Sequence, residues 1–227
     1  MKRKYIIYAV FLLALLLLLG SSLEFRRLET KRAEERALRF DPTQYARDFW
    51  SQRLGSALET ALSAEQMINL FNKDMETAIS KGQTLGQSRV HAYLLKGEGR
   101  IVSQDKNGLR VSVAGPDAIP EILICTGSYI SGNAVRDASG LVDVSAFSDT
   151  MKFNRISSEI NKIVVQEVIR PFLEQGPRVG MVVRFVGAAE VAEEATQDVP
   201  FGGRLKDHES GPAYHLLKVV PVRLDLQ

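Results

Sequence analysis

The chain begins with an apolar stretch between polar flanks. Three basic residues at positions 2–4 precede an unbroken apolar run over residues 5–19, and small residues follow at 20–22. This pattern is typical of a segment that directs the rest of a chain across a membrane. Two interpretations fit it, a signal peptide cut near residues 20–22 or a retained signal anchor over residues 1–23. The Leu-rich run and the absence of an Ala-x-Ala site favour the anchor, whose length approaches the roughly 20 residues of a membrane span.

A helical pattern follows this segment. Residues 24–40 alternate charges without an apolar face, which predicts a solvated stalk. Residues 41–82 carry apolar positions at helical spacing and predict a helical hairpin. Asp41 suits a helix N-cap and Pro42 suits the first helical position. Ser63 begins a capping box, so we expect the second helix to start there.

The pattern changes to that of strands in residues 83–227. Apolar runs bounded by turn residues predict five strands, at residues 90–104, 109–114, 121–126, 179–191 and 213–224. The Asn107-Gly108 pair predicts a hairpin between the first two strands. A helix from about Ser157, closed by Pro171 and Gly176, is expected between the third and fourth strands.

This element order indicates a fold. Three strands, a helix and two strands follow one another in the OB-fold, a five-stranded, partly open barrel. We therefore expect a mainly β structure of the α+β class, with an OB-like barrel over residues 83–227 after the hairpin and the N-terminal membrane segment. Gly97, Gly99 and Gly187 fall inside predicted strands. They predict the bends that so small a barrel needs.

The charge distribution argues against a nucleic-acid partner. The net charge is +2, but residues 1–39 hold nine of the 29 Lys and Arg residues and four of the 27 Asp and Glu residues. That segment therefore carries +5 and the remainder −3. A mildly acidic domain is a poor match to a polyanion, whereas basic residues beside an apolar segment match anionic lipid headgroups.

Few residues suggest catalysis or metal binding. Cys125 is the single cysteine, so no intrachain disulfide forms, and its apolar neighbours predict a small buried hydrophobe. The three histidines lack metal-ligand spacing, and no nucleophile motif is present. We expect no cofactor and no bound metal.

The chain resembles a family of uncharacterised, predicted periplasmic lipoproteins. The similarity is carried by Phe40-Asp41-Pro42 with Tyr45 and Trp50, residues 96–102, residues 132–138, Asn161, residues 182–188 and Pro221-Val222. The resemblance implies an OB-like domain in the periplasm and a gene neighbourhood with sugar ABC transporters. The resemblance does not imply any particular chemical reaction. The chain departs from the family pattern because no cysteine follows the apolar run to accept a lipid.

Asn133, Arg136 and Asp137 are the candidate ligand-binding residues. They lie in a stretch rich in Gly, Ser and Asn, residues 127–140, which predicts a loop. Backbone N–H groups of such a loop, an Arg fork and an amide can bind a carboxylate, a phosphate or sugar hydroxyls. The alternative is that Arg136 and Asp137 fix the shape of the loop itself.

The leading functional hypothesis is a non-enzymatic accessory or binding protein. It would lie in a bacterial inner membrane with its domain in the periplasm, and would contact a sugar-like ligand or components of a sugar ABC transporter. The alternatives are an envelope enzyme acting on a sugar or phosphate substrate and a nucleic-acid-binding OB-fold protein. The fold alone does not distinguish among these three functions.

Overall fold

The structure, a computed structural model, describes residues 40–113, 115, 119–147, 149–193, 201 and 215–227, with isolated positions 4, 5, 8, 12 and 13. The chain divides into two units, residues 1–40 and 41–227, and the fold described below is that of the second. Apart from the isolated positions and Phe40, the predicted membrane segment 1–23 and the stalk 24–40 lie outside the described residues. Within the described part of the chain, no helix is long and apolar enough to cross a membrane.

The first helical segment begins where its capping residue predicts. It consists of α3 (Pro42–Asp48), the π-helical turn η1 (Phe49–Arg53) and α4 (Leu54–Glu59). The Asp41 carboxylate accepts hydrogen bonds from the N–H groups of Thr43 and Gln44 at 2.8 and 3.2 Å. These contacts satisfy two of the donors that an α-helix leaves unpaired at its start.

The second helical segment departs from the prediction. It comprises a short strand and two helices, β1 (Leu62–Ser63), α5 (Ala64–Lys73) and α6 (Met75–Ser80). Ser63 caps α5 as predicted, accepting from the Gln66 N–H at 3.4 Å. Asp74 then breaks the helix, because its backbone is not helical (φ −149°, ψ 81°) and its carboxylate caps α6. The predicted hairpin is wrong, since α3 packs mainly against α8 (Thr150–Ile163), whereas α5 packs against α6, β1 and β2 (Val90–Asp105).

The strands form one sheet that closes on itself. Its members after β1 and β2 are β3 (Gly108–Ser112), β4 (Ile122–Cys125), β5 (Val182–Ala192) and β6 (Leu217–Leu226). The order is β1-β2-β3-β4-β6-β5, and β2 also pairs with β5. The β4–β6 pair is parallel, whereas the other pairs within the ring are antiparallel. The predicted α+β class is confirmed, but the sheet has six strands and is not a simple five-stranded barrel.

A long helix connects β4 to β5, as predicted, with different limits. It runs through α8, the π-helical turn η3 (Val164–Ile169) and α9 (Arg170–Glu174). It begins at Thr150, seven residues before the predicted start, because Asp149 caps it by accepting from the Met151 N–H at 2.8 Å. Pro171 does not end it, since the wide π-helical turn precedes the proline. Gly176, with a φ of +69°, marks its end.

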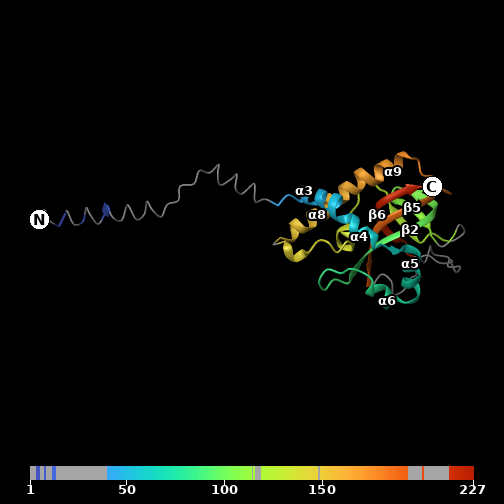
Figure 1. Cartoon of the computed structure of the whole chain (residues 1–227), viewed down its shortest axis with the longest axis horizontal. Helices are drawn as coiled ribbons and strands as arrows, with labels where there is room; N and C mark the ends of the chain where they lie inside the picture. Colours follow the sequence, from blue (N-terminus) through green and yellow to red (C-terminus); the bar gives the residue numbers. More distant parts are fainter. Residues whose placement is uncertain are drawn as a thin grey trace. The chain divides into compact units, whose positions relative to one another are not determined.

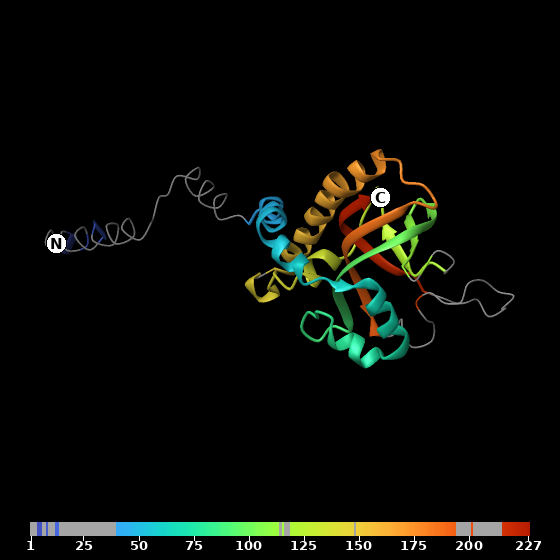
Figure 2. The same ribbon diagram turned by 45° about the vertical axis from the view of Figure 1, so that its right-hand side comes forward.

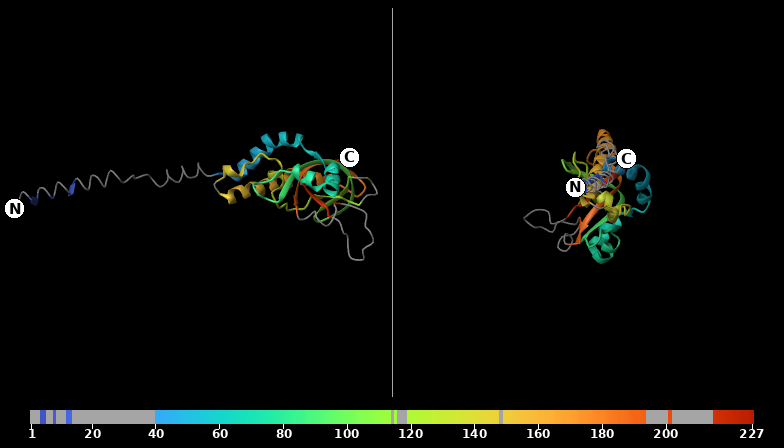
Figure 3. Two further views of the ribbon diagram at one scale, coloured as in Figure 1. Left: turned by 90° about the horizontal axis from the view of Figure 1, so that it is seen from below. Right: turned by 90° about the vertical axis from the view of Figure 1, so that its left-hand side faces the viewer.

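The helices cover the barrel on different sides. The α8–α9 helix runs along one side and packs on β6 (Figures 1 and 2). On another side, α5 packs on β2, and α6 packs on α5. The helix α3 runs beside α8 (Figure 3). Alternate strand residues fill the interior, where Ile101, Val111, Ile124, Phe185 and Val219 are all buried. These residues belong to the apolar runs that predicted the strands.

Candidate functional site

The predicted Gly-rich loop contains a short helix. Residues 126–149 connect β4 to α8 and include α7 (Ala134–Ala138) and the 3₁₀ turn η2 (Val144–Ala146). Arg136 and Asp137 therefore lie on α7, and the prediction of a plain loop is wrong. The helix packs on β5, β2 and α8, so tertiary contacts stabilise a segment that is too short to be helical alone.

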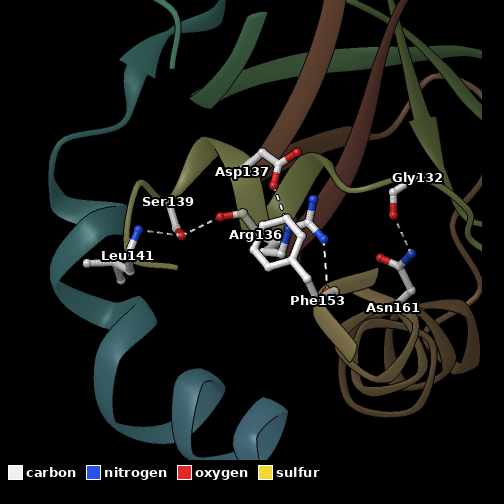
Figure 4. Close-up of polar contacts among 7 residues, drawn as sticks. All are labelled: Gly132, Arg136, Asp137, Ser139, Leu141, Phe153 and Asn161. Atoms are coloured by element: carbon white, nitrogen blue, oxygen red, sulfur yellow. Dashed lines mark hydrogen bonds and ion pairs between the residues drawn. The ribbon is translucent and has the colours of Figure 1, made fainter. Parts of the chain in front are cut away.

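Arg136 lies in the interior of the protein. Its side chain is almost fully buried, and its Nε donates to Asp137 Oδ1 at 2.5 Å. Its Nη1 donates to the carbonyl of Phe153 at 3.0 Å, and its guanidinium lies 3.6 Å from the centroid of the Phe153 ring (Figure 4). Since Phe153 belongs to α8, these contacts hold α7 against α8.

Further hydrogen bonds hold the segments on either side of α7. The amide nitrogen of Asn161, a buried residue of α8, donates to the carbonyl of Gly132 at 3.0 Å (Figure 4). After α7, the Ser139 hydroxyl donates to the Arg136 carbonyl at 2.6 Å and accepts from the Leu141 N–H at 3.2 Å. The connection is thus fixed at both ends of the short helix.

Glu190 of β5 faces the start of α7. Burial raises the pKa of its carboxyl group above the ordinary value, and the nearby Asp137 carboxylate raises it further. A hydrogen bond from the Asn133 N–H and the charge of Arg136 oppose this rise in pKa. Gly132 lies beside this group with a φ of +91°, and a Cβ there would stand 3.1 Å from Glu190 Oε2. The backbone therefore approaches the carboxylate closely where only glycine fits easily.

We expect Glu190→Gln to raise the free energy of unfolding at pH 7. Because the folded-state pKa of Glu190 is raised, the folded protein holds this proton more tightly, and stability decreases as pH rises above 4.5, the ordinary value. Glutamine keeps an acceptor for the Asn133 N–H and removes the charge. Urea unfolding should show a larger gain at pH 7 than at pH 4.5, and an equal gain at both would contradict this assignment.

Two hollows flank the segment of residues 128–132, which we call the 128–132 loop. The helix-side hollow, of about 530 Å³, is lined by the loop and by polar residues that include Asn154, Ser157, Ser158, Lys162, Gln166 and Arg170. The strand-side hollow, of about 730 Å³, is lined by the loop and by residues that include Lys106, Cys125, Glu190 and Lys218. Both volumes lie in the range of small-molecule sites. Tyr129 of the loop is 82% exposed beside both hollows.

The three predicted site residues have different positions relative to these hollows. Asn133 lines the helix-side hollow, whereas Arg136 and Asp137 line neither hollow. The polar residues of α8, η3 and α9 were not predicted as a site. The signal in the sequence that could have revealed them is the polar face of this helix. It lies opposite an apolar face that includes the buried residues Ile156 and Ile160.

Ser157 is an unusual member of this polar face. The residue is 4% exposed and lines the helix-side hollow. Its hydroxyl oxygen is shielded from solvent and has no hydrogen-bond partner in the described part of the protein. Such a group costs free energy when it stays unpaired, and therefore calls for an explanation.

Other reactive side chains lie elsewhere or are held in their less reactive form. Cys125 is half-buried beside the strand-side hollow and not fully buried as predicted. Burial raises the pKa of its thiol, which the charge of Lys218 partly opposes. His91 lies with its Nε2 2.9 Å from Glu193 Oε1. Among the described residues, no group of three or more His, Cys, Asp and Glu side chains is arranged to hold a metal ion.

The ring of strands and the helix between β4 and β5 define an OB-fold protein of the α+β class. A crystal structure of an OB-fold protein from Thermotoga maritima is similar to the chain, with a TM-score of 0.67 and 27% sequence identity, over 83% of this chain and 99% of that one. The family described as predicted periplasmic lipoprotein (DUF2291) matches residues 12–202, and the chain belongs to it. No curated protein matches the chain. The predicted family is thereby confirmed.

Proposed function

We propose that the chain is a non-enzymatic, membrane-anchored binding protein of the periplasm, with its ligand site at the 128–132 loop. The main observation in support of this proposal is that the loop lies between two hollows of ligand size and is held to α8 through Asn161. A fixed loop lowers the entropic cost of ordering a site when a ligand binds. Membership in a family of predicted periplasmic lipoproteins supports the location.

We propose further that residues 1–23 hold the protein in the inner membrane as a signal anchor. A lipid anchor needs a cysteine directly after the apolar run, and the single cysteine of this chain, Cys125, is a residue of β4. A retained apolar segment would replace the lipid. Mass spectrometry of the membrane-extracted protein should find residues 1–23 attached, and a mature protein cut near residues 20–22 would overturn the anchor.

The proposed partner is a sugar ABC transporter, by analogy with the gene neighbourhoods of the family. Tyr129, the exposed residue between the two hollows, is the best position for a photo-crosslinker in the full-length protein in cells. Val179, 59% exposed in the connection before β5, is the matched control. We expect transporter subunits to be captured from position 129 and not from position 179. Equal capture from both positions, or no capture of these subunits, would contradict the partner.

A further inference from the structure

The helix-side hollow has an uneven distribution of charge. Lys162 and Arg170 line it, and none of its described lining residues is acidic. The strand-side hollow differs, because Glu190 lies there together with Lys106 and Lys218. A cavity with cationic and no anionic side chains favours a negatively charged group, which an arginine can hold through two parallel hydrogen bonds.

The neutral lining groups favour a ligand with several hydroxyls. Asn133, Asn154 and Gln166 carry side-chain amides, each of which both donates and accepts hydrogen bonds. Ser158 adds a hydroxyl. Side chains that both donate and accept match hydroxyl groups, which do the same.

Ser157 provides an independent sign of a ligand. Its buried hydroxyl has no partner among the described residues although it belongs to the wall of the hollow. Serine and threonine hydroxyls in helices commonly bond to the backbone of the preceding turn, yet this one does not. Because this oxygen is shielded from solvent, a ligand reaches it only when the wall of the hollow shifts. A ligand oxygen placed there would supply the missing partner and remove the free-energy cost of leaving it unpaired.

We propose that the helix-side hollow binds a small hydroxylated anion, a carboxylate or phosphate that also carries several hydroxyl groups. In this arrangement Arg170 and Lys162 bind the anionic group, and Ser157 and the amides bind the hydroxyls. Lys162 is paired with Glu159 at 2.6 Å, but the Lys162 side chain is 64% exposed, so it can exchange this partner for a ligand anion. Asn161 has a positioning role, because its amide nitrogen binds the Gly132 carbonyl. The inference rests on the proposed binding function and names its ligand class.

The ligand class can be tested by titration calorimetry on the detergent-solubilised full-length protein. The probes are gluconate, glucose 6-phosphate, neutral glucose and inorganic phosphate. We expect gluconate or glucose 6-phosphate to bind at least about tenfold more tightly than glucose and phosphate. The affinity for this anion should decrease as the NaCl concentration is raised. If glucose binds as tightly as both anions, the proposed preference for an anion is wrong, but the proposed binding function is not contradicted.

Two further outcomes would also overturn the ligand class. Phosphate binding as tightly as glucose 6-phosphate would show that the hydroxyl groups add nothing. If none of the probes binds, the proposed ligand class is wrong. The proposed function is tested separately by crosslinking from position 129, so the two failures are distinguishable.

Matched variants locate the binding in this hollow. Ser157→Ala should weaken binding of the preferred anion by up to about tenfold without lowering the melting temperature, because the lost hydroxyl has no protein partner. Ser56→Ala is its control on α4, where the exposed hydroxyl bonds to its own helix. Lys162→Gln should also weaken binding, whereas Lys152→Gln, an exposed residue of α8 outside the lining, should not. Wild-type binding by both Ser157→Ala and Lys162→Gln would overturn the proposal.

Discussion

Replacing Arg136 with methionine should lower the free energy of unfolding by about 3 kcal/mol or more, a typical cost of removing one partner from a buried ion pair. The change leaves the Asp137 carboxylate, with its side chain 14% exposed, without its guanidinium partner. It also removes the hydrogen bond to the Phe153 carbonyl and the contact with the Phe153 ring. Methionine fills much of the same volume, so the loss reports the polar contacts. Urea unfolding monitored by circular dichroism measures it.

Arg184 of β5 provides the control for this prediction. Its Nη2 lies 3.0 Å from Glu98 Oε2, and both side chains are about half exposed. Since exposed ion pairs contribute little, Arg184→Met should change stability by no more than about 1 kcal/mol. Equal losses in the two variants would show that Arg136 does not hold α7 to α8 in the way that its contacts indicate.

Arg136→Lys separates charge from geometry at the same site. Lysine keeps the positive charge but cannot supply two differently directed guanidinium donors or a flat face to an aromatic ring. We therefore expect an intermediate loss of stability. A lysine variant as stable as the wild type would assign the effect to charge alone.

The strands and two of the helix starts were well predicted because their signals are local. Apolar runs bounded by turn residues placed all five ring strands within about four residues of their observed ends, and the Asn107-Gly108 turn joins β2 and β3 as expected. Asp41 and Ser63 cap the helices that follow them. A cap depends on a side chain and the backbone two or three residues ahead, which a single sequence contains.

The candidate site was less accessible to sequence reasoning because its contacts join distant segments. Composition indicated a loop around residue 136, yet contacts of Arg136 with Phe153 and of Asn161 with Gly132 shape this region. Sequence spacing does not show which charged residue becomes buried. The same holds for the hairpin: its two helices pack on α8 and β2, and their apolar faces gave no information about which partner they cover.

Glycines in strands connect the sequence prediction to the shape of the barrel. The register of β5 against β6 shifts between Val186 and Gly187, so an irregularity lies where Gly187 predicted a bend. Gly99 of β2 lies close to its neighbour, since a Cβ there would stand 2.5 Å from the carbonyl oxygen of Ser112. Close backbone approach explains glycine at both positions.

Gly187→Ala is therefore expected to destabilise the protein by about 3 kcal/mol, the upper part of the range for overpacked interiors. A Cβ at this buried position would stand 2.5 Å from the carbonyl oxygen of Val220 and 2.6 Å from Val219 Cγ1. The first contact is with backbone, so relief requires β5 and β6 to move apart. That movement would weaken pairing on which closure of the sheet depends. Thermal and urea unfolding measure the loss.

Gly55→Ala tests whether this loss comes from the close approach and not from the loss of a glycine. Gly55 lies in α4, and a Cβ there would meet nothing within 4 Å. Alanine is favoured over glycine within a helix by about 0.5–1 kcal/mol, so the same substitution should stabilise the protein here. Opposite signs at positions 55 and 187 are the expected result. A neutral or stabilising effect at position 187 would mean that β5 and β6 separate without cost, and that the sheet does not need glycine to close.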